Sequence, residues 1–205
     1  MRARRGFVVA MFLVCAGCAG ERVATPAIRT PVDPKTQMAA LEQRIFSLVQ
    51  DARHRIDPAA KPLVHDAELT DIAERRSRDM AARNYIAHDS PEGVSAADLI
   101  MNEDQSFQGL LGENLAAQPF NRQFGIDVDV YARRLVDTWL SSPAHRANLA
   151  YAPYDRSAVG AAVGGDTIYV IQLFATDLGL PAPPAAKPSR PPVPNRPSAA
   201  QNGAP

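Results

Sequence analysis

The sequence predicts an α+β fold, a three-layer α-β-α sandwich in which helices flank a mostly antiparallel central sheet. Apolar residues recur at helical spacing through much of the chain up to about residue 150, which predicts helices. Two β-prone runs follow, joined by Gly164-Gly165-Asp166, and this pattern predicts a closing hairpin. The second run is apolar on both faces, which predicts a strand covered by helices on two sides.

Composition divides the chain into four segments. We expect a lipoprotein-type signal peptide over residues 1–17, a polar linker over 18–36, the folded domain over 37–180 and a proline-rich disordered tail over 181–205. About 145 residues suffice for one buried core and are too few for two. The tail holds nine of the eighteen prolines and almost no large apolar residues, so burial cannot offset the entropy of ordering it.

The first segment is typical of an export signal. Arg2, Arg4 and Arg5 precede an apolar run that is too short to span a bilayer, and Cys15-Ala16-Gly17-Cys18 resembles a bacterial lipobox. Cys18 would then be lipidated and would anchor the mature protein to a membrane. An ordinary signal peptide or an uncleaved anchor are the alternatives. Ala19 is not the aspartate of an inner-membrane retention signal, so we expect an outer-membrane or cell-surface lipoprotein.

Two amphipathic helices open the domain. The first is predicted to end at Asp57-Pro58 and has an apolar stripe of Met38, Leu41, Ile45, Leu48, Val49 and Ala52. Asp66 is predicted to cap the second, which runs to about Asn84. Its buried stripe is Leu69, Ile72, Ala73 and Met80, and its outer face is a solvated charge face of Glu74, Arg75, Arg78 and Asp79.

Shorter elements follow. Ser95-Ala-Ala-Asp98 predicts a capping box and a short helix, and residues 110–116 predict a short strand. A helix over about 127–140 should bury Trp139. Ser142-Pro143 predicts an N-cap and N1 proline, with the serine oxygen bound to backbone N–H groups and His145 near the positive end of the helix.

The last two strands are predicted over 157–163 and 167–174. In the second, Gln172 shares a face with Ile168, Val170 and Phe174, and it is one of the candidate residues that support the cleft described below.

The charge balance excludes some partners. Lys plus Arg and Asp plus Glu each number 22, and removal of residues 1–17 takes away three arginines and no acid. The resulting slightly acidic protein lacks the basic surface that nucleic acid or anionic lipid would require. Both cysteines, Cys15 and Cys18, lie in the signal segment, so the folded part has no disulfide.

Four motifs together resemble the CAP superfamily of cysteine-rich secretory, antigen 5 and pathogenesis-related proteins, in its bacterial secreted form. These are His88 after the second helix, Gly112-Glu113-Asn114-Leu115, Trp139-x-x-Ser142-x-x-His145-Arg146-x-Asn148, and the closing Ile171-Gln172-Leu173-Phe174. The resemblance covers about residues 41–175. It implies an α-β-α sandwich with a surface cleft lined by two histidines and two acidic residues.

Residue by residue, the resemblance assigns His88, Glu113 and His145 to the cleft. The second acid would stand at Ser142, so this chain departs from the full set there, and both a four-ligand metal site and a carboxylate acid/base pair are in doubt. His88 and His145 are candidate zinc ligands, with Glu113 and water completing the shell; the alternative is two hydrogen-bonded histidines without a metal.

The supporting residues admit plainer roles. The alternative to a catalytic role makes Glu113 and Asn114 structural hydrogen-bond acceptors, with backbone amides and a histidine as donors. Ser142 is expected to cap a helix, and the sequence lacks the Gly-x-Ser-x-Gly elbow that exposes a serine nucleophile. Arg146 and Asn148 are expected to pin the loop before the hairpin.

Three functions follow from this cleft. The protein is expected to bind a lipid or cell-wall ligand, or to act as a metal-assisted or acid/base hydrolase of peptides or cell-wall polymers through His88, Glu113 and His145. It is otherwise an interaction scaffold with a vestigial cleft. The replacement of the second acid by Ser142 favours binding.

Overall fold

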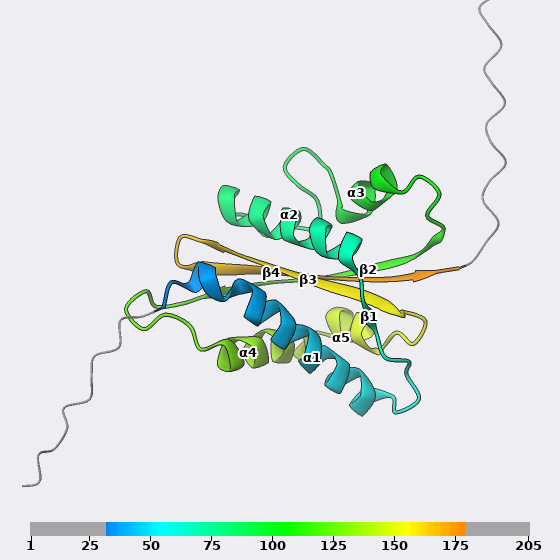
Figure 1. Cartoon of the computed structure of the whole chain (residues 1–205), viewed down its shortest axis with the longest axis horizontal. Coiled ribbons are helices and arrows are strands. Elements are labelled where there is room, and N and C mark those ends of the chain that lie inside the picture. Colours follow the sequence, from blue (N-terminus) through cyan, green and yellow to red (C-terminus); the bar gives the residue numbers. More distant parts are fainter. Residues whose placement is uncertain (1–31, 179–205) are drawn as a thin grey trace, which may run out of the picture. The chain divides into compact units, whose positions relative to one another are not determined.

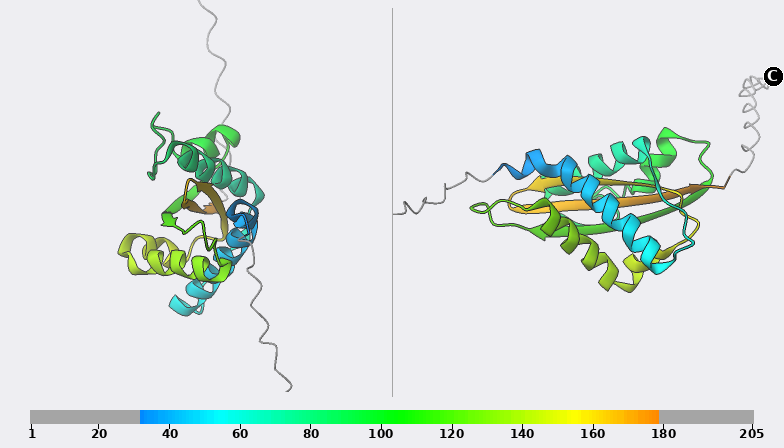
Figure 2. Two further views of the ribbon diagram at one scale, coloured as in Figure 1. Left: turned by 90° about the vertical axis from the view of Figure 1, so that its left-hand side faces the viewer. Right: turned by 60° about the horizontal axis from the view of Figure 1, so that its bottom comes forward.

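The computed structural model of the protein describes residues 32–178, which form three layers (Figure 1). Helices α2 (Ala67–Arg83) and α3 (Ala96–Glu103) cover one face of a sheet. The other face carries α1 (Met38–Ile56), preceded by a 3-10 turn η1 (Pro34–Gln37), together with α4 (Val128–Ser141) and α5 (Pro143–Ala150). Figure 2 shows the sheet between these two helical layers. The predicted α-β-α sandwich is therefore confirmed.

The sheet has four strands in the order β1-β3-β4-β2. They are β1 (Val64–His65), β2 (Gly109–Pro119), β3 (Arg156–Gly164) and β4 (Thr167–Asp177). Only the two-residue pairing of β1 with β3 is parallel, so the sheet is mostly antiparallel as expected. Strand β4 is central and is buried from Ile168 to Thr176, which confirms the strand with two apolar faces.

The hairpin that closes the domain has a two-residue turn, Gly165-Asp166. Gly165 has φ +61°, the left-handed value that a type II′ turn requires of its first central residue. A glycine also allows the hairpin to meet α2: a Cβ on Gly160 would lie 2.2 Å from the carbonyl carbon of Ala73. Helix α2 therefore packs directly on the backbone of β3.

Each face of the sheet has its own core. The α1–α4–α5 face buries Leu41, Ile45, Trp139 and Leu149 against Ile168, Val170 and Phe174 of β4. The α2–α3 face buries Leu69, Ile72, Met80 and Ile100 against Tyr169, Ile171 and Leu173. The alternation of β4 side chains thus supplies both cores, and the predicted stripes of the first two helices are buried, with Leu48 only half-buried.

Side chains cover parts of both sheet edges. On β2 the carbonyl oxygens of Glu113 and Leu115 accept hydrogen bonds from Asn148 Nδ2 and Trp139 Nε1, each at 3.0 Å. Beyond Ser157, β3 has no partner strand on its outer side, and there the N–H of Ala161 donates to Glu42 Oε1 at 2.7 Å. The carboxylate of Glu42 takes the place of a strand carbonyl.

Most of the predicted caps are present. Asp66 accepts from the Leu69 N–H at 3.0 Å, and Ser95 and Asp98 form a complete capping box. Asn84 ends α2 in the left-handed conformation, φ 54°, and its Oδ1 accepts from the Tyr169 hydroxyl. The predicted cap at Ser142 is wrong in one respect: Ser142 is the N-cap residue, but its side chain makes no capping bond.

Three expectations differ from the structure or lie outside it. Strand β2 is longer than the predicted residues 110–116, and β1 was not expected. The signal peptide over 1–17, Cys18, most of the linker and the tail over 181–205 lie outside the described residues. Within residues 32–178, no helix combines the length and apolar composition that crossing a bilayer requires.

Candidate functional site

The candidate cleft residues come from three elements that meet at β2, an edge strand of the sheet. His88 lies in the loop between α2 and α3, Glu113 in the middle of β2, and His145 in the first turn of α5. Glu113 is paired with Leu173, whose side chain faces the α2–α3 layer, whereas α5 belongs to the opposite layer. The two histidines therefore approach the same strand from opposite faces of the sheet.

The direct contact within this set joins His88 and Glu113. His88 Nδ1 lies 3.2 Å from Glu113 Oε1, and the side chains are 64% and 14% exposed respectively. Burial raises the pKa of Glu113 above its usual value, and the nearby His88 and Arg76 charges oppose that rise. The largely buried carboxyl group of Glu113 thus contacts the imidazole of His88, which is itself exposed to solvent. Backbone amides and a histidine were expected to be the partners of this carboxylate; among the described residues its hydrogen-bond partner is the histidine, His88.

His145 lies nearby but forms no hydrogen bond with either of these side chains in the described part of the chain. Desolvation lowers the pKa of His145, and the charge of His88 lowers it further, so the neutral imidazole is favoured. Its Nδ1 is buried and has no protein partner within residues 32–178. The structure thus places the third residue within electrostatic range of the pair and leaves one of its nitrogens uncommitted.

Two asparagines connect α5 to β2. Asn148 Nδ2 donates to the Glu113 carbonyl at 3.0 Å and to Asn114 Oδ1 at 2.9 Å. Asn114 is fully buried, and its Nδ2 donates to the carbonyl of His145 at 3.2 Å. The expectation that Asn148 pins the loop before the hairpin is wrong, because Asn148 instead holds α5, and with it His145, against the strand that carries Glu113.

The other supporting residues have different surroundings. Arg146 is exposed, and in the described part of the chain its side chain makes no hydrogen bond or ion pair. Gln172 is buried beneath the site, where its Nε2 donates to Ser157 Oγ at 3.2 Å. Trp139 is core, as predicted, and is fully buried. Gly112 is required by packing, because a Cβ there would lie 2.4 Å from the Tyr154 hydroxyl.

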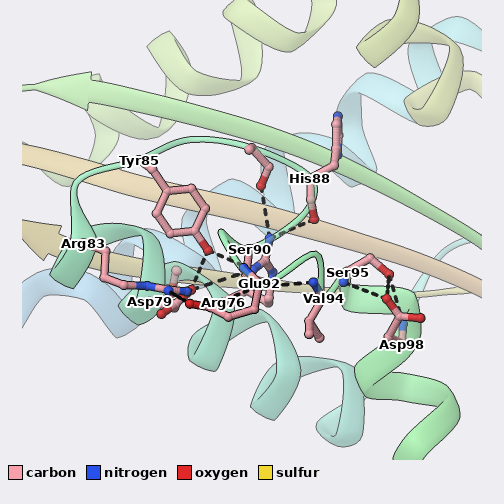
Figure 3. Close-up of polar contacts among 12 residues, drawn as sticks. Arg76, Asp79, Arg83, Tyr85, His88, Ser90, Glu92, Val94, Ser95 and Asp98 are labelled. Atoms are coloured by element: carbon pink, nitrogen blue, oxygen red, sulfur yellow. Dashed lines mark hydrogen bonds and ion pairs between the residues drawn. The ribbon is translucent and has the colours of Figure 1, made fainter.

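Arg76 organises the loop that carries His88 (Figure 3). Its guanidinium is buried and donates to the Tyr85 hydroxyl at 3.0 Å and to the carbonyls of Ala87 and His88 at 3.1 and 2.8 Å. Asp79 lies 3.9 Å away and supplies the nearest opposite charge. Because the Arg76 guanidinium donates hydrogen bonds to backbone carbonyls of this loop, it fixes the path of the chain up to His88.

The rest of the same loop is tied by short-range bonds (Figure 3). Ser90 Oγ accepts from the N–H groups of Glu92 and Val94, each at 3.2 Å, and Ser90 N–H donates to the Val94 carbonyl at 2.9 Å. An ion pair of 2.5 Å joins Arg83 to Glu92. The segment between α2 and α3 is thus anchored on both sides of His88.

Sequence reasoning missed the role of Arg76. The signal was present, because Arg76 falls four residues from both Ile72 and Met80 and so lies on the buried stripe of α2. Arg53 follows the same pattern on α1: it is buried and donates to the carbonyls of Leu149 and Tyr154. An arginine on an apolar stripe indicates a buried guanidinium that binds backbone carbonyls.

An apolar cavity adjoins the polar cleft. It has a volume of about 140 Å³ and lies between α3 and β2, with Glu113 and His88 among its lining residues. His145 does not line it. The candidate site is therefore a polar cleft at the strand edge with an apolar recess beside it.

The residues do not form a metal centre as they are arranged. Zinc sites use three or four protein ligands. Within residues 32–178, no three His, Cys, Asp or Glu side chains lie close enough together to hold a metal ion. Among the described residues, no third ligand lies with the candidate zinc ligands His88 and His145. In addition, His88 Nδ1 is already hydrogen-bonded to Glu113.

Comparison with known proteins places the domain in a family. The model for CAP, the cysteine-rich secretory protein family, matches residues 52–174, which is more than half of the chain. The uncharacterized protein YkwD of Bacillus subtilis (strain 168) is 26% identical over 131 residues, which cover 64% of this chain and 46% of YkwD.

Two solved structures share the fold. An extracellular protein containing an SCP domain from Bacillus anthracis is 32% identical with a TM-score of 0.54, covering 71% of this chain and 44% of its own. An outer surface protein from Borrelia burgdorferi is 24% identical with a TM-score of 0.53, covering 71% of this chain and 96% of its own. This chain spans slightly under half the length of YkwD and of the B. anthracis protein.

Proposed function

This chain belongs to the cysteine-rich secretory protein (CAP) family, and we propose that it is an exported protein that binds a cell-envelope component in the cleft formed by His88, Glu113 and His145. One observation carries the proposal: the largely buried Glu113 carboxyl group on an edge strand lies 3.2 Å from the exposed His88 imidazole. A desolvated acceptor beside an exposed imidazole and a recess has the layout of a small ligand site.

The cleft has the chemistry of recognition more than of covalent catalysis. Ser142 occupies the position of the second acid. Within the described residues, its side chain forms no hydrogen bond with the side chain of His145. Among residues 32–178 no cysteine is present to serve as a nucleophile. Glu113, His88 and His145 together offer an acceptor and two imidazoles that can donate or accept, which suits a ligand with amide or hydroxyl groups. The proposal involves no metal.

The cellular location is part of the proposal. The relatives include an extracellular protein and an outer surface protein. The signal-like residues 1–17 and the lipobox-like segment ending at Cys18 support export followed by lipid anchoring at the outer membrane or cell surface. An anchored domain of this kind would meet envelope polymers at high local concentration.

Histidine NMR tests the binding proposal. The chain has four histidines, so their imidazole signals can be assigned by single substitutions in the full-length protein. Soluble peptidoglycan fragments are expected to shift the signals of His88 and His145 and to leave that of His54, exposed on α1, in place. Glu113→Gln should weaken binding about tenfold, since a charged acceptor is lost. Shifts that Glu113→Gln leaves unchanged, or none at all, would contradict the proposal; a response to phospholipid vesicles alone would identify a lipid ligand instead.

The hydrolase alternative is favoured by one observation, the raised pKa of Glu113. Desolvation moves the pKa of this carboxyl group upward, in the direction that suits a general acid or base. Peptidoglycan incubated with the protein would then release new amino groups or reducing ends, and Glu113→Gln would slow that release by about a hundredfold or more. Hydrolysis that survives this substitution would remove Glu113 from the mechanism.

A further inference from the structure

The recess beside the cleft is lined mostly by hydrocarbon, with Ser95, Glu113 and His88 as its polar lining residues. Ala96, Ala97 and Ile100 form its α3 wall, and Leu111 and Leu173 form its sheet wall. Glu113 and His88 lie at its polar end. Its volume of about 140 Å³ is close to that of engineered apolar cavities of about 150 Å³ that bind benzene-sized molecules, although this recess is open to solvent on one side.

The packing of α3 keeps this space open. The helix begins at Ala96, so its closest residues to the recess are two alanines whose side chains end at Cβ. The Ser95–Asp98 capping box, with bonds of 2.8 Å and 3.1 Å, fixes the start of the helix at Ala96 and so places the two alanines at the recess. Ala97 is itself exposed and stands at the opening.

The polar groups of the recess determine which ligands can bind in it. Glu113 offers carboxyl oxygens, which accept hydrogen bonds from N–H or O–H groups. A second carboxylate placed there would meet a like charge in a poorly solvated position. A ligand that fills the recess and reaches Glu113 must therefore combine an aliphatic group with a hydrogen-bond donor.

We propose that the recess is a subsite for a short aliphatic group attached to an N–H donor, such as the side chain and amide of an aliphatic residue in a peptide. The proposal rests on the proposed function in that Glu113 is the acceptor in both. It names the substrate class of that cleft: peptides with a small aliphatic residue, in preference to anionic amphiphiles.

A methyl NMR titration of the full-length chain tests the subsite. The probe is isobutyramide, with isobutyrate as the anionic counterpart and acetamide as the head group without the aliphatic part. Isobutyramide is expected to shift the methyl signals of Ile100, Leu111 and Leu173. Acetamide should bind at least about tenfold more weakly, because it lacks the aliphatic group whose burial accounts for at least that factor. Isobutyrate, which keeps that group, should also bind more weakly, because its carboxylate meets the like charge of Glu113.

Matched substitutions on α3 locate the binding. Ala97→Leu places an aliphatic side chain in the opening and should weaken isobutyramide binding at least about tenfold. Asn102→Leu adds the same side chain at an exposed position of the same helix that does not line the recess, and should leave binding unchanged.

The outcomes separate this proposal from the broader one. Unmoved methyl signals, equal binding of isobutyrate, or binding that survives Ala97→Leu would overturn the subsite. If peptidoglycan fragments still shifted the His88 signal in that case, ligand binding at the cleft would stand without the subsite. If neither peptidoglycan fragments nor isobutyramide shifted the histidine signals, both the subsite and the proposed ligand binding at the cleft would be overturned.

Discussion

Glu42 shows how a single buried acid can impose a cost on this fold. It replaces a strand carbonyl at the outer edge of β3, and burial raises its pKa to about 7. The hydrogen bond from Ala161 and the positive charge of Arg78 oppose the shift, and the charge of Glu74 adds to it. The native protein therefore holds a proton that the unfolded chain releases near the ordinary glutamate pKa of 4.5.

The sign of the resulting pH dependence is fixed by linkage. Between about pH 4.5 and 7 the native state binds more protons at Glu42 than the unfolded state, so this residue makes stability fall as pH rises through that window. Glu42→Gln keeps an acceptor for Ala161 and removes the charge. We expect the variant to match the wild type at pH 4 and to be roughly 1–2 kcal/mol more stable at pH 8, a figure reduced for partial solvent exposure.

Urea denaturation at several pH values measures this difference. Glu74→Gln, on the same surface but with no backbone partner for its side chain, is the control and should show a much smaller pH-dependent gain. An unfolding free energy of Glu42→Gln that runs parallel to the wild type from pH 4 to pH 8 would contradict the assignment.

Arg76 is expected to hold the His88 loop by its donors to backbone carbonyls. Arg76→Met keeps the buried stem and removes those donors, leaving two carbonyls and the Tyr85 hydroxyl without their charged partner. We expect a loss of about 3 kcal/mol of unfolding free energy. Amide hydrogen exchange should become faster at residues 87–90, because the loop loses its anchor.

Arg78→Met provides the matched comparison for Arg76→Met. Arg78 lies on the same helix, is exposed, and pairs only with Glu74 one turn away among the described residues, so its loss should cost under about 0.5 kcal/mol. Equal effects of the two substitutions would show that the buried guanidinium does not anchor the loop.

At the scale of elements, the packing of α2 on β3 depends on the absence of a side chain. A Cβ at Gly160 would meet the backbone of Ala73 at 2.2 Å, and neither backbone can yield without moving a whole helix or strand. Gly160→Ala should therefore cost at least about 2 kcal/mol of unfolding free energy. Gly93→Ala is the control: nothing lies within 4 Å there, and its φ of +79° should cost about 1 kcal/mol through backbone strain alone. Thermal unfolding compares the two, and a Gly160→Ala protein as stable as Gly93→Ala would contradict the close packing.

The sequence predicted the elements whose signals are local. The stripes of α1 and α2, the Ser95–Asp98 capping box and the Gly165-Asp166 turn each depend on residues within a few positions of one another. Strand β1 was missed because two residues have no measurable period, and it exists only through pairing with β3 far along the chain. The two buried arginines were missed because a charged side chain is ordinarily assigned to solvent.

The site was predictable only through the family resemblance. His88 and Glu113 are 25 residues apart, and no local pattern indicates that their side chains lie within hydrogen-bond distance. The partners of Asn148, 34 and 35 residues away on β2, are likewise set by how α5 packs on the sheet. Sequence reasoning assigned that asparagine to the wrong segment, since the residue type indicates a hydrogen bond without indicating to what.

For the whole molecule, the sequence outside the described residues leads to one prediction about location. If Cys18 is lipidated, Cys18→Ser should move the protein from the membrane fraction to the soluble fraction, because its attachment would depend on acyl chains alone. Cys15→Ser, three residues earlier, should leave it in the membrane fraction. Fractionation followed by immunoblotting distinguishes the two variants, and a protein that stays with the membrane in both would exclude anchoring through Cys18.

The chain enters and leaves the described domain at opposite ends of the sheet. Helix turn η1 contacts the β3 end nearest the hairpin, whereas β4 runs from that hairpin to Asp177 at the far end (Figure 2). Tension applied between residues 32 and 178 would be directed along β4. Because β4 is paired on both sides, its ladders would have to slide as a unit instead of opening one bond at a time. The pairing of β4 on both sides is therefore expected to resist a force that pulls residues 32 and 178 apart.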